Sequence, residues 1–208
     1  MSDDDVRAAV IAERRDQVEV LTALTPGQWD APTLCEGWRV REVVAHTTSA
    51  YRLSFGRFLL DLLAARGSIN RAADRRARAD AAVMGPSELL ACLRDNVEHP
   101  WTPPGGGPAG ALSHDVIHGL DITVALGLDR TVPPERLSIV LGGLKPKNIG
   151  FFGIDLSGVQ LRATDREWTF GEGEPVHGTA ADLLLVVCGR RLPPGRLTGA
   201  RADRYTRA

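Results

Sequence analysis

The chain of 208 residues has few cysteines, no long apolar run and almost no net charge. Cys35, Cys92 and Cys188 are odd in number, lie far apart and form no Cys-x-x-Cys pair, which excludes a disulfide scaffold and favours a reducing, cytoplasmic compartment. The acidic start lacks the basic and apolar regions of a signal peptide, and the apolar run at 183–188 is too short to span a bilayer. A formal net charge of -1 gives no electrostatic reason to bind nucleic acid or an anionic membrane.

The first two-thirds of the sequence has the hydrophobic periodicity of helices. Thr25, Pro26 and Gln28 have the pattern of a capping box with proline at the first helical position, which predicts a short helical turn. Ser87 is the predicted cap of a later helix, and the proline- and glycine-rich segment 99–110 is predicted to be a loop. The predicted helices cover 3–24, 39–65, 70–82, 86–97 and 111–126.

The pattern changes after residue 132. Residues 133–144 and 178–189 read as helices, 158–164 and 167–170 alternate as half-buried strands do, and 196–199 is a predicted last short strand. The predicted fold class is therefore mostly α, with a four-helix bundle at 1–130 followed by a small α+β C-terminal domain at 131–208.

Three histidines are the most informative residues of the chain. His114 and His118 are four residues apart in an apolar stretch, so a helix projects both from one face, one turn apart. His46 lies on the apolar side of an earlier predicted helix. Three imidazoles from two helices, with a fourth position open, are typical of a catalytic zinc site. The alternative is that they are hydrogen-bonded core residues.

Other polar residues are candidates for supporting roles. Asp121 shares a helix face with His114 and His118, so it is predicted to orient an imidazole or, failing that, to pair with an arginine. Glu42 precedes His46 by one turn, and we expect it at the exposed edge of its helix. Cys35 is the only cysteine near the candidate site, either as a packed thiol or as a nucleophile.

Two stretches carry a resemblance to a known family. Residues 34–46 (LCEGWRVREVVAH) and 114–122 (HDVIHGLDI) resemble the mycothiol-dependent maleylpyruvate isomerase family, one of the DinB-like metal-binding helical bundles. Residues 159–165, with Trp168 and 178–183, resemble that family's second domain. The resemblance implies a divalent metal, most often zinc, and mycothiol as the thiol cofactor. Carried over by position, it implies His46, His114 and His118 as the metal ligands.

The resemblance also implies a reaction. A metal-bound thiol is deprotonated, and its thiolate adds to a small electrophilic substrate, giving either cis-trans isomerisation or S-transfer. Maleylpyruvate isomerases place Glu where His114 stands. A neutral histidine in place of a carboxylate raises the net charge of the site by one unit. The site should then hold the thiolate more firmly, which favours S-transfer over isomerisation. Arg190 is predicted to bind a substrate carboxylate or, alternatively, to be solvated. The competing hypothesis is a non-catalytic metal- or ligand-binding bundle, and the sequence does not indicate the oligomeric state.

Overall fold

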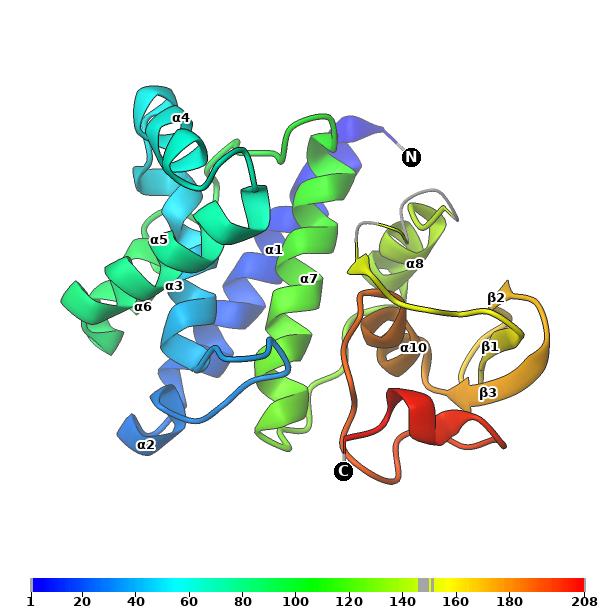
Figure 1. The fold of residues 1–208 in the computed structure, drawn as a ribbon. Coiled ribbons are helices and arrows are strands. Elements are labelled where there is room, and N and C mark those ends of the chain that lie inside the picture. Colours follow the sequence, from blue (N-terminus) through cyan, green and yellow to red (C-terminus); the bar gives the residue numbers. More distant parts are fainter. Residues whose placement is uncertain (1, 146–149, 151, 208) are drawn as a thin grey trace. The chain divides into compact units, whose positions relative to one another are not determined.

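The structure is a computed structural model that describes residues 2–145, 150 and 152–207. The chain divides into two compact units, Met1–His118 and Gly119–Ala208, here called the N-terminal and the C-terminal unit. The N-terminal unit is helical and the C-terminal unit combines helices with a small sheet, which confirms the predicted fold class (Figure 1). The predicted domain boundary at residue 130 stays a prediction. No helix among the described residues is long and apolar enough to cross a membrane.

Some helices of the N-terminal unit begin where a serine or threonine supplies a side-chain cap. The predicted capping box is confirmed, because the Thr25 backbone N–H donates to Gln28 at 2.8 Å and the Gln28 N–H donates to the Thr25 hydroxyl at 3.4 Å. Helix α3 packs against α5 and α6, and α1 packs against α6 (Figure 1). The helices are α1 (Asp3–Thr22), α2 (Pro26–Trp29), α3 (Val40–Arg52), α4 (Phe55–Ala64), α5 (Ile69–Val83), α6 (Pro86–Arg94) and α7 (Gly107–Ala125), the last of which spans the boundary between the units.

The long helix predicted over 39–65 is wrong, because the chain breaks it into α3 and α4. Leu53 adopts an extended conformation, with φ −86° and ψ 123°, and Ser54 then caps α4 by accepting a hydrogen bond from the Arg57 N–H at 3.3 Å. Helix α4 has no buried residue, and Phe55 is 80% exposed. The break contains neither glycine nor proline, so periodicity alone gave no sign of it.

Two further boundaries differ from the predictions. Helix α6 begins at Pro86 as predicted, but its N-cap is Gly85 and not Ser87, because the Glu88 carboxylate accepts from the Gly85 N–H at 2.7 Å, and the helix ends at Arg94 rather than 97. The predicted loop over 99–110 ends earlier than expected, because α7 already begins at Gly107.

The C-terminal unit contains a three-stranded sheet in the order β2-β1-β3, with β1 antiparallel to β2 and parallel to β3. Helix α10 contacts β1, β3 and α8. The apolar side chains from Leu183 to Val187 are fully buried, which makes α10 the centre of this unit's core. The elements are α8 (Pro134–Gly142), β1 (Val159–Ala163), β2 (Thr169–Gly171), β3 (Glu174–Gly178), α10 (Ala180–Val187) and the 3-10 helix η1 (Ala202–Tyr205).

Strand β3 was not predicted, and the predicted strand over 196–199 is wrong. Only an isolated bridge between His177 and Thr198 remains of that strand. The segment of β3 contains Pro175 and polar residues, so its sequence lacks the alternation of apolar and polar residues that predicts a strand. Gly173, directly before β3, has φ 129° and lies so close to the backbone of Gly158 that a Cβ atom at this position would clash with it.

Candidate metal centre

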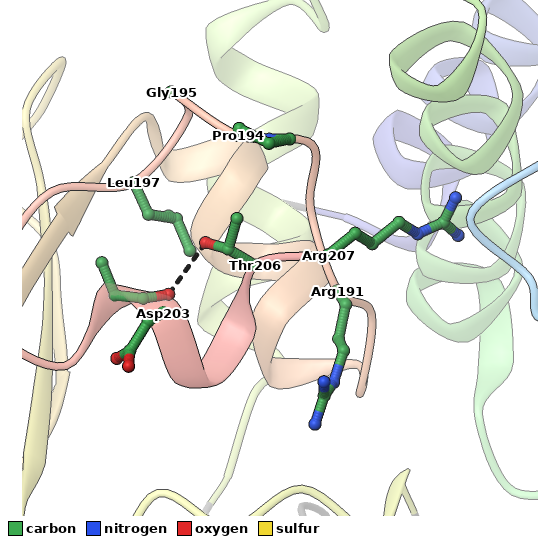
Figure 2. A pocket seen from close by; sticks show the side chains of 8 residues that line it. Arg191, Pro194, Gly195, Leu197, Asp203, Thr206 and Arg207 are labelled. Carbon is green, nitrogen blue, oxygen red and sulfur yellow. Dashed lines mark hydrogen bonds between the residues drawn. The ribbon is translucent and has the colours of Figure 1, made fainter.

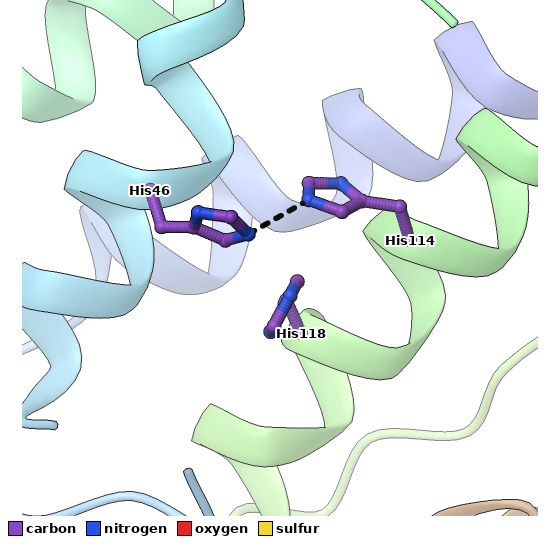
Figure 3. A group of neighbouring side chains, drawn as sticks. All are labelled: His46, His114 and His118. Carbon is purple, nitrogen blue, oxygen red and sulfur yellow. Dashed lines mark hydrogen bonds between the residues drawn. The ribbon is translucent and has the colours of Figure 1, made fainter. Parts of the chain in front are cut away.

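The three histidines come together in the N-terminal unit. His46 projects from α3, and His114 and His118 project from α7, so that the rings point toward one another (Figure 3). Their ring centroids are 4.8 to 5.1 Å apart, and one ring nitrogen of each lies within 4.8 Å of the others. The Nε2 atoms of His46 and His114 are 3.1 Å apart. All three side chains are half-buried, and we call them the histidine cluster.

The donor set of the histidine cluster fits a divalent cation. Neutral imidazole is an ordinary ligand of zinc, and two nitrogens bound to one tetrahedral ion at 2.0–2.1 Å lie about 3.3 Å apart. The 3.1 Å between the Nε2 atoms of His46 and His114 is close to that separation. Without an ion, one of these two nitrogens must carry a proton to make the contact favourable, because two lone pairs repel.

A tight loop before α3 carries Trp38 to the cluster. Thr33 closes the loop, because its N–H and its hydroxyl both donate to the Trp38 carbonyl, at 3.0 and 2.9 Å. Gly37 has φ 73°, a conformation that glycine adopts without strain. The Trp38 indole N–H donates to Asp74 on α5 at 2.7 Å, which fixes the ring beside His46, with centroids 5.2 Å apart.

A second tryptophan lies beside the cluster, next to His114. Trp101, in the loop before α7, lies with its ring centroid 5.2 Å from that of His114. Trp101 and Trp38 are both half-buried. Two large, mainly apolar rings thus lie next to the imidazoles of the cluster.

Cys35 belongs to the same neighbourhood. Its Sγ lies 3.8 Å from Nδ1 of His118, and its side chain is half-buried. The prediction that this cysteine is near the candidate site is confirmed, whereas its role stays open between a packed thiol and a nucleophile. Cys188, by contrast, is buried in the C-terminal unit, where burial raises the pKa of its thiol to about 12 and keeps it protonated at neutral pH.

Asp115 is a site residue that the sequence analysis missed. Its Oδ1 lies 3.0 Å from Nδ1 of His114, and its Oδ2 accepts from Nε of Arg14 on α1 at 2.8 Å. The side chains of Asp115 and Arg14 are only 3% and 1% exposed. Gln17, also on α1, donates to the backbone carbonyl of Asp115 at 2.6 Å. The signal in the sequence was a carboxylate next to a candidate ligand, but its partner lies 101 residues away.

The other predicted supporting residues lie in ion pairs. Asp121 and Arg190 form a bidentate pair within the C-terminal unit, at 2.9 and 2.8 Å, as the arginine alternative for Asp121 anticipated. Their predicted roles in the reaction stay predictions. The expectation of an exposed Glu42 is wrong, because this residue is 4% exposed and its carboxylate accepts from the backbone N–H and the guanidinium of Arg39.

The C-terminal unit also contains an open pocket of about 460 Å³ (Figure 2). Its wall is partly formed by the turn of η1, where the Thr206 hydroxyl donates to the Ala202 carbonyl at 2.9 Å. None of the predicted site residues lines it. The lining residues are Arg191, Pro194, Gly195, Leu197, Ala202, Asp203, Thr206 and Arg207.

A helical unit that directs three imidazoles from two helices toward one point has the architecture of a bundle metal site. The family model described as the mycothiol maleylpyruvate isomerase N-terminal domain matches residues 10–100. This part of the chain is therefore similar to that family's N-terminal domain. The matched range contains Cys35, Trp38 and His46 and ends before His114.

Two solved structures share the fold of the whole chain. A crystal structure of the mycothiol-dependent maleylpyruvate isomerase has 13% sequence identity and a TM-score of 0.64, covering 97% of this chain and 94% of that one. The crystal structure of a histidine-to-alanine mutant of this isomerase has 12% identity and a TM-score of 0.63, with the same coverage. At these identities the likeness establishes the fold. No curated protein sequence matches the chain.

Proposed function

We propose that this protein is a metal-dependent enzyme that uses mycothiol and adds its thiolate to a small electrophile. The observation that carries the proposal is the geometry of the histidine cluster. The Nε2 atoms of His46 and His114 are 3.1 Å apart, which is close to the distance between two nitrogen ligands of one ion. The match of residues 10–100 to the family model supports the use of mycothiol, as do solved structures of a mycothiol-dependent isomerase with the same fold.

In this proposal His46, His114 and His118 hold a divalent ion, zinc being the natural choice for neutral imidazoles. Such an ion lowers the pKa of a coordinated thiol, so that the thiol is present as the thiolate at neutral pH. The rings of Trp38 and Trp101 lie beside His46 and His114 and would help to keep bulk water from the nucleophile. The thiol of Cys35 lies beside His118 but is not needed as a nucleophile, because mycothiol supplies the sulfur.

The thiolate has two possible outcomes with an electrophile. Addition to an activated cis double bond makes that bond single, rotation follows, and elimination of the thiolate gives the trans isomer. If the thiolate displaces a leaving group, or if the adduct is protonated and released, the reaction is S-transfer. Three neutral ligands leave the site one positive charge richer than a site with a carboxylate in place of His114, which stabilises bound thiolate. We therefore propose S-transfer as the main reaction.

The metal and thiol requirements are tested on the purified protein. We expect about one divalent ion per chain by elemental analysis, lost in His46→Ala and in His118→Ala and retained in the control His177→Ala, whose side chain is on β3. In the cobalt-loaded protein, mycothiol should produce a sulfur-to-metal charge-transfer band. Wild type that binds no ion when divalent metal is supplied would overturn the proposal. An unchanged cobalt spectrum at saturating thiol would overturn the use of mycothiol and favour the non-catalytic bundle.

The choice between the two reactions is tested with His114→Glu. Wild type should transfer mycothiol to electrophiles and isomerise maleylpyruvate poorly, whereas His114→Glu should keep the metal and gain isomerase activity. Cys35→Ser should retain thiol-dependent activity in both assays. Efficient isomerisation by wild type would contradict S-transfer, and complete loss of activity in Cys35→Ser would make Cys35 the nucleophile.

A further inference from the structure

The second ring nitrogen of His114 is held by a buried carboxylate. Nδ1 of His114 lies 3.0 Å from Oδ1 of Asp115. Nε of Arg14 donates to the other carboxylate oxygen at 2.8 Å, so Asp115 is paired with a cation that is always charged. An ionised carboxylate only accepts hydrogen bonds. Nδ1 of His114 must therefore donate, which places the proton of a neutral ring on Nδ1 and the lone pair on Nε2, the atom that faces His46.

Helix α1 fixes the carboxylate in this position. Besides its bond to Asp115, Arg14 donates through Nη1 to the backbone carbonyls of His99 and Val97, at 2.7 and 3.3 Å. Its guanidinium carbon lies 5.2 Å from the centroid of the Tyr51 ring. Gln17 holds the backbone of Asp115 itself at 2.6 Å. With these contacts on the carboxylate and its arginine, Asp115 has little freedom to turn away from His114.

We infer that Asp115 is a positioning residue that selects the Nδ1–H tautomer of His114 and so directs the Nε2 lone pair into the histidine cluster. This inference rests on the proposed function, because it assigns the cluster to a metal. A carboxylate that accepts from the remote N–H of a metal-bound imidazole fixes the ring and strengthens it as a ligand. Asp115 acts through His114 and does not itself bind the ion.

A purely structural role explains the pair less well. The desolvation cost of a buried ion pair often cancels its attraction, and apolar residues of similar volume are commonly as stable. The neighbouring residues of α7, Leu112 and Val116, are already fully buried and apolar, so packing alone did not require a charge at this position. The orientation of His114 gives the carboxylate a specific task.

The tautomer is measured first, on the metal-free wild-type protein. Nitrogen-15 NMR distinguishes the two neutral tautomers of a histidine ring, and the signals are assigned by comparison with His114→Ala. We expect His114 to carry its proton on Nδ1. A proton on Nε2 would overturn the inference, whether or not the protein binds a metal. Because the measurement uses the wild-type side chain at Asp115, it does not depend on whether an Asp115 variant folds.

Zinc affinity is measured second, by competition with a chelator. Asp115→Asn, whose single carbonyl oxygen cannot serve both Arg14 and His114, should bind zinc about 10- to 100-fold more weakly than wild type. The control Leu89→Ala removes a fully buried side chain of α6 and should lower stability without changing zinc affinity. An equal loss in this control would mean that Asp115 acts only through stability.

The outcomes separate the inference from the proposed function. Absence of zinc binding by wild type would overturn the proposed function and, with it, the role of Asp115. Zinc binding by wild type with unchanged affinity in folded Asp115→Asn would overturn the inference alone.

Discussion

The two units of the chain bury helices of very different character. In the C-terminal unit, α10 buries an unbroken apolar run from Leu183 to Val187, and its one buried carboxylate, Asp182, pairs at its edge with Thr179 and a half-exposed Arg196. In the N-terminal unit, α7 buries Asp115 against Arg14 of α1, where both side chains are almost inaccessible to water. The helix at the centre of the C-terminal core is thus apolar along its buried run, whereas α7 buries a charged pair beside the histidine cluster.

The largest expected effect comes from breaking the buried pair. Asp115→Ala should reduce the free energy of unfolding by about 4 kcal/mol, because it leaves the Arg14 guanidinium buried without its counter-ion. The double variant Arg14→Met with Asp115→Leu should recover most of that stability. Urea unfolding of the metal-free proteins measures both, since a bound ion would stabilise the folded state. A loss below about 1 kcal/mol in Asp115→Ala would contradict the described role of the pair.

A smaller effect is expected from the apolar side of the comparison. Leu184→Ala in α10 should reduce the free energy of unfolding by about 3 kcal/mol, through lost burial and a cavity. The exposed Leu60→Ala on α4, where Leu60 is 60% exposed, serves as the control and should change it by less than about 0.5 kcal/mol. Zinc affinity should stay unchanged in both. A selective loss of zinc binding in Leu184→Ala would show that the two interiors are not separable in function.

The smallest expected effect concerns Glu42 and depends on pH. Burial by itself raises the pKa of Glu42, but the hydrogen bonds from the Arg39 side chain and backbone outweigh it, so the net pKa lies below the usual value. A lowered pKa stabilises the fold above the pKa of the unfolded state, and this stability is lost as the pH falls through the pKa of the folded state.

We therefore expect Glu42→Gln to be less stable than wild type by about 1 kcal/mol at pH 7. The difference should shrink as the pH falls below about 4.3, the pKa of an unperturbed glutamate. The exposed Glu36→Gln is the matched control and should show no such trend. Unfolding curves over a range of pH measure the effect, and a constant difference down to the lowest pH would contradict it.

Local chemistry explains which parts of the fold were predictable. The Thr25 capping box, the helix at α5 and the strand β1 depend on residues a few positions apart, and all three were found. The break at Leu53 and Ser54 was missed, because a single serine cap between two helices does not interrupt the helical spacing of the apolar residues on either side. Strand β3 was missed, because its place in the sheet comes from parallel pairing with β1 rather than from its own residues.

The sequence by itself determined the three histidines as a candidate site, because the spacing of His114 and His118 fixes their common face on any helix. Only the tertiary structure decided what surrounds them. Arg14 reaches Asp115 across 101 residues of sequence, and no periodicity encodes such a contact. Residues so far apart meet only in the folded chain, where the contacts of Arg14 and Gln17 with Asp115 make the carboxylate beside His114 a buried, oriented hydrogen-bond acceptor.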